Sequence, residues 1–330
     1  MTSNKKANST DPLTEPWHIK KVAIVGSGAV GSYYGARLAK AGLEVVFLLR
    51  SDYSHVSEHG MKISSVAGDF ELPQVNCRRS SREIGVVDLV IIAWKTTSNS
   101  QYFDVVSPLV GSQTRILTLQ NGLGSAHELS NLFGAWRVYG GLCFVCINRL
   151  GPGQISHTAS GLIRVGKYLG QERRLTQDER VELDYLVACL SNAEIDCEGV
   201  SSLERAQWMK LVWNIPFNGL AISEGGIDTK TLLAMPGMEQ RVRRIMREVQ
   251  QVAASLGHSI EDSFLDSQIE VTRPMDAYRP SSMIDYVEGR AVEVDSIWRE
   301  PVRRAHEVGV PVPEIETLLQ EIETRLSERE

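Results

Sequence analysis

The sequence has no apolar run long enough to cross a lipid bilayer, because its richest run, residues 89–94, has only the length of a strand. Its first eighteen residues are polar, include Pro12 and Pro16, and lack the apolar segment and cleavage site of a signal peptide. We therefore interpret residues 1–18 as a flexible tail. Without an export signal, we expect the chain in the cytoplasm and away from membranes.

A surplus of basic residues is also absent. The chain has 35 Lys and Arg against 41 Asp and Glu, which gives a net charge of −6. Proteins that bind nucleic acids usually carry the opposite balance. We therefore expect no nucleic-acid partner, although a local basic pocket for an anionic ligand remains compatible with this charge.

Cysteine is scarce, and the odd count of five excludes a framework of disulfides. Cys143 and Cys146 form a C-x-x-C, which could be a redox or metal-binding pair or two buried thiols on a strand. We favour buried thiols, because residues three apart on a strand point to opposite faces. No second C-x-x-C and no cluster of histidines completes a metal site. We expect no bound metal.

Short apolar runs alternate with helical segments in the first half of the chain. The predicted strands are 21–25, 44–49, 88–93, 115–119 and 195–197. Such alternation indicates parallel strands joined by right-handed crossovers, which form a doubly wound sheet. Glycines and β-formers between residues 137 and 168 predict hairpins that extend this sheet.

Strand signals vanish after about residue 200. Long amphipathic helical patterns then cover residues 202–222, 238–256, 281–309 and 314–328. At 330 residues, the chain is long enough for two cores. The sequence thus predicts an α/β fold, with a dinucleotide-binding Rossmann-type domain at 19–200 and an all-helical substrate and catalytic domain at 201–330.

A glycine motif directly follows the first predicted strand. Gly26, Gly28 and Gly31, with Ser27, Ala29 and Val30 between them, form G-x-G-x-x-G at the start of a helix. In a Rossmann domain the first glycine permits a tight turn, the second lets the backbone approach a pyrophosphate, and the third lets helix and strand pack closely. The motif therefore predicts a dinucleotide site at residues 26–31.

The end of the second strand distinguishes NAD from NADP. NAD enzymes place an acidic residue there, which binds the ribose 2′-hydroxyl. Here the position carries Arg50, whose guanidinium suits a 2′-phosphate, although Asp52 lies just beyond. We therefore predict NADP (NADPH) as the cofactor. Lys95 and Asn121 follow two further strands and are candidates for cofactor contact at the same edge of the sheet.

Lys210, Asn214 and Asn218 are spaced four apart, so on a helix they form one polar stripe among large apolar residues. A solvated helix face is the alternative interpretation, but such a face would carry fewer large apolar neighbours. Because burying unpaired polar groups is costly, we favour a stripe that meets a ligand or a partner. Ser282, near a predicted helix start, is a second polar candidate.

With these motifs identified, the sequence resembles the ketopantoate reductase (2-dehydropantoate 2-reductase) family from about Lys20 to the last helix. The motifs are G-x-G-A-V-G at 26–31, N-G-x-G at 121–124, W-x-K-L-x-x-N-x-x-x-N at 208–218, and S-S-M followed by G-R-x-x-E-x-D within 281–295. The resemblance implies NADPH-dependent reduction of ketopantoate, a small 2-keto acid, to pantoate. This reaction belongs to pantothenate synthesis.

The resemblance also implies roles for single residues. Lys210 matches the proton donor to the ketone oxygen, and Glu293 matches an acidic catalytic residue that holds substrate and cofactor. The other matched residues are Arg50 and Lys95 near the adenosine end of NADPH, Asn121 near the nicotinamide, Cys146 at the cofactor through its backbone, and Asn121, Asn214, Asn218 and Ser282 at the substrate.

Two departures from the family pattern concern the substrate pocket. Arg279 stands where some members have asparagine, and the spacing from Ser282 to Glu293 is one residue shorter than in others. The alternatives are therefore a reductase or dehydrogenase of another branched 2-keto or hydroxy acid, and a non-catalytic NADPH sensor. A homodimer is expected from related folds, and residues 243–252 could form either its seam or the core of one subunit.

Overall fold

The strands of the N-terminal half form one sheet in the computed structural model, which describes residues 17–170 and 173–329. Their order across the sheet is β4-β3-β9-β8-β7-β6-β1-β2-β5, and β10 pairs with β9. The bounds are β1 Lys21–Val25, β2 Glu44–Leu48, β3 Met61–Ser65, β4 Phe70–Leu72, β5 Cys77–Arg78, β6 Val87–Ile92, β7 Val110–Thr118, β8 Val138–Gly151, β9 Gln154–Lys167 and β10 Cys197–Gly199.

The central strands are parallel, as the alternation of strands and helices predicted. β1 pairs in parallel with β2 and β6, and β7 continues this arrangement to β8. β8 then turns back as the long antiparallel hairpin with β9, which confirms that residues 137–168 extend the sheet. The doubly wound Rossmann-type sheet is confirmed.

Helices cover both faces of the sheet because side chains alternate along each strand. Val22 and Ile24 of β1 pack in one core with α1 and α6, whereas Ala23 and Val25 pack in another with α3, α4 and α5. The bounds on the sheet side are α1 Ala29–Lys40, α2 Tyr53–His59, α3 Ser81–Ile84, α4 Tyr102–Val106, α5 Ser125–Phe133, α6 Gln177–Asn192, and the 3-10 turns η1 Thr96–Gln101, η2 Ser107–Leu109 and η3 Ala135–Arg137.

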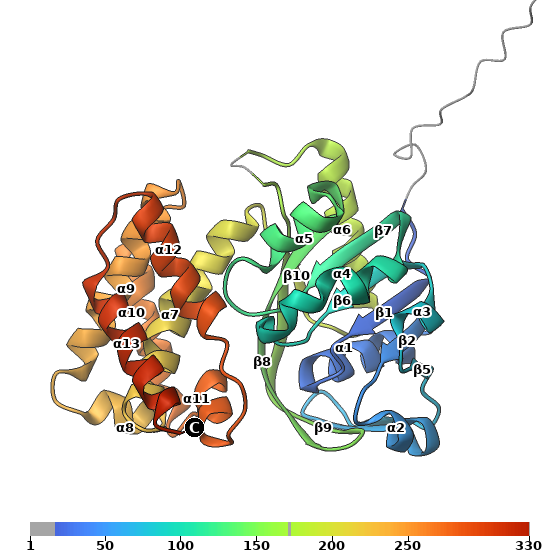
Figure 1. The fold of residues 1–330 in the computed structure, drawn as a ribbon, viewed down its shortest axis with the longest axis horizontal. Helices are drawn as coiled ribbons and strands as arrows, with labels where there is room; N and C mark the ends of the chain where they lie inside the picture. The colour runs from blue at the N-terminus through green and yellow to red at the C-terminus, as the bar shows by residue number, and fades with distance from the viewer. Residues whose placement is uncertain (1–16, 171–172, 330) are drawn as a thin grey trace, which may run out of the picture.

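The helical domain lies beside the sheet domain, with α7 next to β8 and its partners (Figure 1). The bounds are α7 Leu203–Ser223, α8 Thr229–Ala234, α9 Met238–Ser255, α10 Asp262–Thr272, η4 Arg273–Met275, α11 Ser281–Val287, the π-turn η5 Asp295–Arg299, α12 Glu300–Glu307 and α13 Pro313–Ser327. None of the described helices is long and apolar enough to span a membrane.

The amphipathic stretch of α9 faces the core of its own domain. Ile245, Met246, Val249 and Val252 are all buried in one apolar cluster with α7 and α13. Of the two possibilities for residues 243–252, the structure therefore shows the subunit core.

The single helical pattern predicted over 281–309 is wrong. The chain leaves helical geometry at Gly289, which has a positive φ of +71°, and resumes it in the π-turn η5. The break lets the Glu293 carboxylate reach the N–H of Thr96 in the other domain, at 2.8 Å. The amphipathic pattern of residues 281–309 carries no signal for such a contact between domains.

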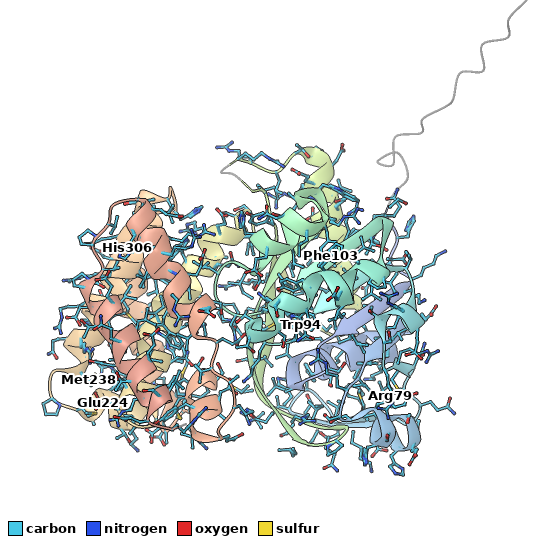
Figure 2. The ribbon with its side chains drawn as sticks, viewed as in Figure 1. Arg79, Trp94, Phe103, Glu224, Met238 and His306 are labelled. Carbon is cyan, nitrogen blue, oxygen red and sulfur yellow. The ribbon has the colours of Figure 1, made fainter. Side chains whose placement is uncertain are left out.

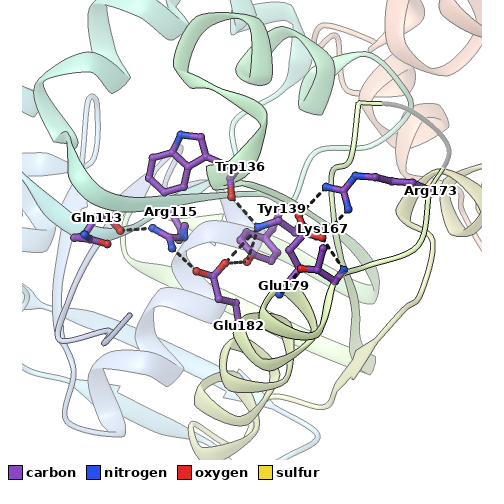
Figure 3. Close-up of polar contacts among 9 residues, drawn as sticks. Gln113, Arg115, Trp136, Tyr139, Lys167, Arg173, Glu179 and Glu182 are labelled. Atoms are coloured by element: carbon purple, nitrogen blue, oxygen red, sulfur yellow. Dashed lines mark hydrogen bonds and ion pairs between the residues drawn. The ribbon is translucent and has the colours of Figure 1, made fainter. Parts of the chain in front are cut away.

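Buried charges join α6 to the edge of the sheet where β8 begins (Figure 3). The Glu182 carboxylate pairs with Arg115 and Lys167, and it accepts a hydrogen bond from the Tyr139 hydroxyl at 2.8 Å. The Lys167 ammonium also donates to the Trp136 carbonyl at 2.7 Å. This cluster lies at the end of the sheet opposite the carboxyl ends of the parallel strands.

The predicted tail at residues 1–18 extends too far by two residues. Residues 1–16 lie outside the described part of the chain, but Trp17 is only 7% exposed. Its ring stacks on Tyr139 at 6.2 Å, and its indole N–H donates to the Asp88 carbonyl at 3.3 Å. The folded domain therefore already includes Trp17.

We expect Trp17→Ala to lower the free energy of unfolding by about 3 kcal/mol, because it removes a large buried ring and leaves a cavity. Chemical denaturation checks this value. Phe103→Ala is the matched control, because Phe103 is 62% exposed (Figure 2), and its change should stay below about 0.5 kcal/mol. Equal effects of the two substitutions would contradict the packing role of Trp17.

Candidate active site

The glycine loop between β1 and α1 has the geometry that the motif predicts. Gly26 has a φ of +95°, and a Cβ there would lie 2.1 Å from the backbone nitrogen of Trp94. A Cβ on Gly31 would lie 2.3 Å from the Gly26 carbonyl oxygen. Gly28 is different: it is exposed, and a Cβ there would meet no atom within 4 Å, so a ligand can approach its backbone.

Gly28 is also the N-cap of α1, and no side chain caps that helix end. Backbone N–H groups at a helix N-terminus attract phosphate groups, so the loop fits a dinucleotide diphosphate. The intervening residues leave this approach clear: the Ser27 hydroxyl donates to the Leu48 carbonyl at 3.2 Å, and Ala29 and Val30 begin the helix, partly buried.

Arg50 and Asp52 occupy different environments at the end of β2. Arg50 is exposed, and its guanidinium donates to the neutral Gln101 side chain at 2.5 Å. Asp52 is buried, and both its oxygens accept hydrogen bonds from Arg149 at 2.6 Å. Burial alone would raise the pKa of Asp52, but the hydrogen bonds from Arg149 and Ser51 lower it, so the carboxylate stays ionised and already paired.

The loop after β6 contacts the helical domain through an ion pair and hydrogen bonds. The Lys95 ammonium lies 2.7 Å from the Asp285 carboxylate and donates to the Ala291 carbonyl at 2.9 Å. The next residue, Thr96, donates its N–H to Glu293. Burial raises the pKa of Glu293, while hydrogen bonds from Thr96 and the charge of Lys95 oppose the rise. Two of the predicted residues, Lys95 and Glu293, therefore lie at one junction.

The Lys210 ammonium reaches from α7 to the edge of the sheet. It donates to the Asn121 side-chain oxygen at 2.9 Å and to the Cys143 carbonyl at 2.8 Å, and it lies 5.3 Å from the Phe144 ring centre. Burial lowers the pKa of Lys210, and electrostatic interactions with the Cys143 and Glu293 side chains oppose this shift. The Lys210 side chain is thus partly buried, and its two acceptors fix where the ammonium lies.

A small pocket opens beside this ammonium, between α7 and the ends of β7 and β8. Lys210, Asn121 and Asn214 line it together. The remaining lining residues are Thr118, Gln120, Gly122, Ser125, Gly140, Gly141, Leu142, Gln207 and Leu211.

The sequence reasoning missed most of this lining. Gln207 had a usable signal, because it precedes Lys210 by three residues and so extends the polar stripe of α7 by one turn. Ser125 and Gln120 had none, because their place depends on how the N-G-x-G loop turns. Gly122 shows that constraint: its φ is +80°, and a Cβ there would lie 2.3 Å from the Ser296 carbonyl oxygen.

Asn218 and Ser282 lie together but deeper than the pocket. Asn218 is 1% exposed, and its side chain donates to the Asn214 carbonyl at 3.1 Å and accepts the Ser282 N–H at 2.9 Å. The Asn218 side chain thereby fixes the start of α11 against α7. Ser282 is likewise buried, at 3% exposed.

The C-x-x-C pair is not a disulfide, and all five cysteines are free. The Cys143 side chain packs with the α1 face of the sheet, whereas the Cys146 sulfur lies 4.0 Å from the Tyr278 hydroxyl of the helical domain. Burial raises the pKa of Cys143 to about 11, which makes its thiol a poor nucleophile. Within residues 17–170 and 173–329, no group of three or more His, Cys, Asp or Glu side chains is arranged to hold a metal.

Comparison with known sequences assigns both halves to one family. The profile of ketopantoate reductase PanE/ApbA matches residues 22–170, and the profile of its C-terminal domain matches residues 202–325. The chain belongs to this family. Its members are oxidoreductases of the 2-dehydropantoate 2-reductase type, with a Rossmann-like fold.

Individual members of the ketopantoate reductase family are similar over nearly the whole chain. A 2-dehydropantoate 2-reductase from Nostoc sp. is 39% identical over 92% of this chain and 94% of its own. The crystal structure of 2-dehydropantoate 2-reductase from Geobacter metallireducens has a TM-score of 0.87 and 42% identity, covering 92% of this chain and 99% of its own.

A more distant structure shares only the fold. The ternary structure of D-mandelate dehydrogenase with NADH and anilino(oxo)acetate has a TM-score of 0.84 at 21% identity, covering 93% of this chain and 98% of its own. The ketopantoate reductase fold is thus also used by a dehydrogenase crystallised with NADH.

We expect Asn218→Ala to lower the free energy of unfolding by about 1–3 kcal/mol, because it leaves the buried Ser282 N–H without its acceptor. Chemical denaturation measures the change. Asn214→Ala is the control of the same chemistry, since no hydrogen bond of the Asn214 side chain is present among the described residues. A stable Asn218→Ala protein would show that α11 does not depend on this contact.

Proposed function

We propose that this chain catalyses the NADPH-dependent reduction of ketopantoate to pantoate, with Lys210 as the proton donor. The observation that carries the proposal is the Lys210 ammonium, held by Asn121 and the Cys143 carbonyl at a pocket between the sheet and α7. A nicotinamide bound at this edge of the sheet would supply the hydride to the keto carbon.

Lys210 suits the other half of the reaction. Hydride addition leaves negative charge on the former ketone oxygen, and an ammonium within hydrogen-bond distance both stabilises and protonates that oxygen. Burial lowers the pKa of Lys210, so its proton is transferred more readily than that of an ordinary lysine. The product is then the hydroxy acid and a neutral amine, which regains its proton from solvent.

The carboxylate-bearing side of the substrate needs polar partners that are not already satisfied. Asn214 lines the pocket four residues after Lys210 and is the better candidate. Asn218 and Ser282 are engaged with each other, so we propose that they support the substrate site by fixing α11. We propose that Glu293, whose carboxylate accepts the Thr96 N–H, helps to hold cofactor and substrate where the two domains meet.

Arg50 and Asp52 support NADP over NAD. Arg50 is exposed and faces a neutral partner, so it is free to pair with a 2′-phosphate, whereas Asp52 is buried against Arg149. The alternative is NADH, the cofactor in the D-mandelate dehydrogenase structures. Another branched 2-keto acid remains the alternative substrate. Location in the cytoplasm and assembly as a homodimer stay predictions from the sequence.

The direct test follows NADPH oxidation at 340 nm with ketopantoate, 2-ketoisovalerate, pyruvate and no substrate. We expect fast turnover with ketopantoate, because the family and the pocket chemistry both favour it. Turnover only with another keto acid would keep the reaction and replace the substrate. Tight NADPH binding without any turnover would favour the sensor interpretation.

We expect Lys210→Ala to lower kcat by on the order of 10²–10⁴-fold, because the proton donor is lost, while NADPH affinity changes little. Lys230→Ala, which removes an exposed lysine from α8, should leave kcat unchanged.

The pH profile gives an independent check on Lys210. A general acid must be protonated, so kcat should fall as pH rises through the lowered pKa of Lys210. Arginine at position 210 stays protonated, so Lys210→Arg should lose that falling limb whatever activity it keeps. A wild-type kcat that is flat up to pH 10 would remove Lys210 as the acid.

A further inference from the structure

Four arginines near the carboxyl ends of β2 and β5 have no carboxylate partner in the part of the chain that the structure describes. They are Arg50, Arg78, Arg79 and Arg82. Most of the other described arginines form ion pairs, as Arg149 does with Asp52. The one buried carboxylate of the adjoining loop, Asp52, is thus already paired with Arg149.

The strand register brings Arg79 beside the loop that begins at Arg50. β2 and β5 are parallel, with Leu48 opposite Arg78, and the Leu49 N–H donates to the Arg78 carbonyl at 2.9 Å. Neighbouring strands lie about 4.8 Å apart. Arg50 and Arg79 therefore leave the same edge of the sheet from adjacent strands.

The side chain of Arg79 lies on the segment that follows Arg50. Its guanidinium sits 4.4 Å from the Tyr53 ring centre and donates to the Ser54 hydroxyl at 3.0 Å. Figure 2 shows Arg79 at the corner of the sheet domain, beside α2. Ser54 is a neutral acceptor, and a guanidinium has further N–H groups that can bind an anion.

Arg78 and Arg82 are placed differently. The Arg78 guanidinium donates to Asn76 at 2.9 Å and to the Cys77 carbonyl at 2.7 Å, so it folds back along its own strand. Arg82 belongs to α3, one element further along the chain. Of the side chains of these three neighbours of Arg50, that of Arg79 alone donates a hydrogen bond to α2 in the described structure.

A phosphate monoester is the ligand chemistry that fits this pair. In Rossmann domains the adenosine ribose lies near the end of the second strand, so a 2′-phosphate bound by Arg50 would lie beside the start of α2, where Arg79 makes its contacts. Guanidinium–phosphate hydrogen bonds are among the strong, charge-assisted class. We infer that Arg79 is a second specificity-determining residue, which binds the 2′-phosphate of NADP together with Arg50. This inference rests on the proposed preference for NADP.

The test measures binding without catalysis, by titrating the full chain with 2′,5′-ADP and with 5′-AMP, which lacks the 2′-phosphate. At about 0.15 M salt the Debye length is about 8 Å, so distant charges contribute little. Arg79→Ala and Arg79→Gln should each weaken 2′,5′-ADP about tenfold or more, and should change 5′-AMP less than about twofold. Arg79→Lys keeps the charge and should recover part of the affinity.

Arg78→Ala is the matched control, because it removes the same charge from the adjacent residue and should change either affinity less than about twofold. Equal weakening of both nucleotides by Arg79→Gln would mean that Arg79 only supports the loop, and would overturn the inference. Unchanged binding of 2′,5′-ADP would overturn it as well.

Arg50→Ala separates this inference from the proposed function. If wild-type protein prefers 2′,5′-ADP and Arg50→Ala loses that preference while Arg79→Ala keeps it, only the role of Arg79 fails. If wild-type protein binds the two nucleotides equally, the NADP preference fails and the role of Arg79 fails with it.

Discussion

The site depends on one ammonium being held across two domains. Lys210 belongs to the helical domain, and both its hydrogen-bond acceptors, Asn121 and the Cys143 carbonyl, belong to the sheet domain. Taking a lysine out of water disfavours its charged form, so its surroundings must supply oxygen acceptors or the group becomes neutral. The turn of the N-G-x-G loop and the course of β8 supply them, and this requirement fixes where α7 must lie.

The glycine loop and the strand order could be predicted because their causes are local. Gly26 and Gly31 are required by contacts within one β-α unit, and the alternation of β1 follows from its two covered faces. The stripe of Lys210 and Asn214 was readable for the same reason, since helical spacing alone puts them on one face. Helical spacing only groups these two residues, and their roles in proton donation and substrate binding come from the resemblance to a family.

What the sequence concealed are contacts between distant segments. Trp17 belongs to the fold because its ring stacks on Tyr139 and its indole N–H donates to the Asp88 carbonyl. No sequence pattern near Trp17 predicts these contacts. The break within residues 281–309 lets Glu293 accept the N–H of Thr96, which lies almost two hundred positions earlier in the chain. The spacing of Asn218 predicted a polar partner, and one such partner is the backbone N–H of Ser282 at the start of α11.

The junction residues also show how burial acts on opposite charges. Burial lowers the pKa of Lys210 and raises the pKa of Glu293, so both groups are driven toward their neutral forms. The negative charge of Glu293 opposes the shift of Lys210, and the positive charge of Lys95 opposes the shift of Glu293. Burial is the largest influence on the pKa of Lys210, and Glu293 contributes a smaller one in the opposite direction. Any movement that separated Lys95 and Thr96 from Glu293 would leave that carboxylate less stabilised as an anion, and would weaken the field that keeps Lys210 protonated.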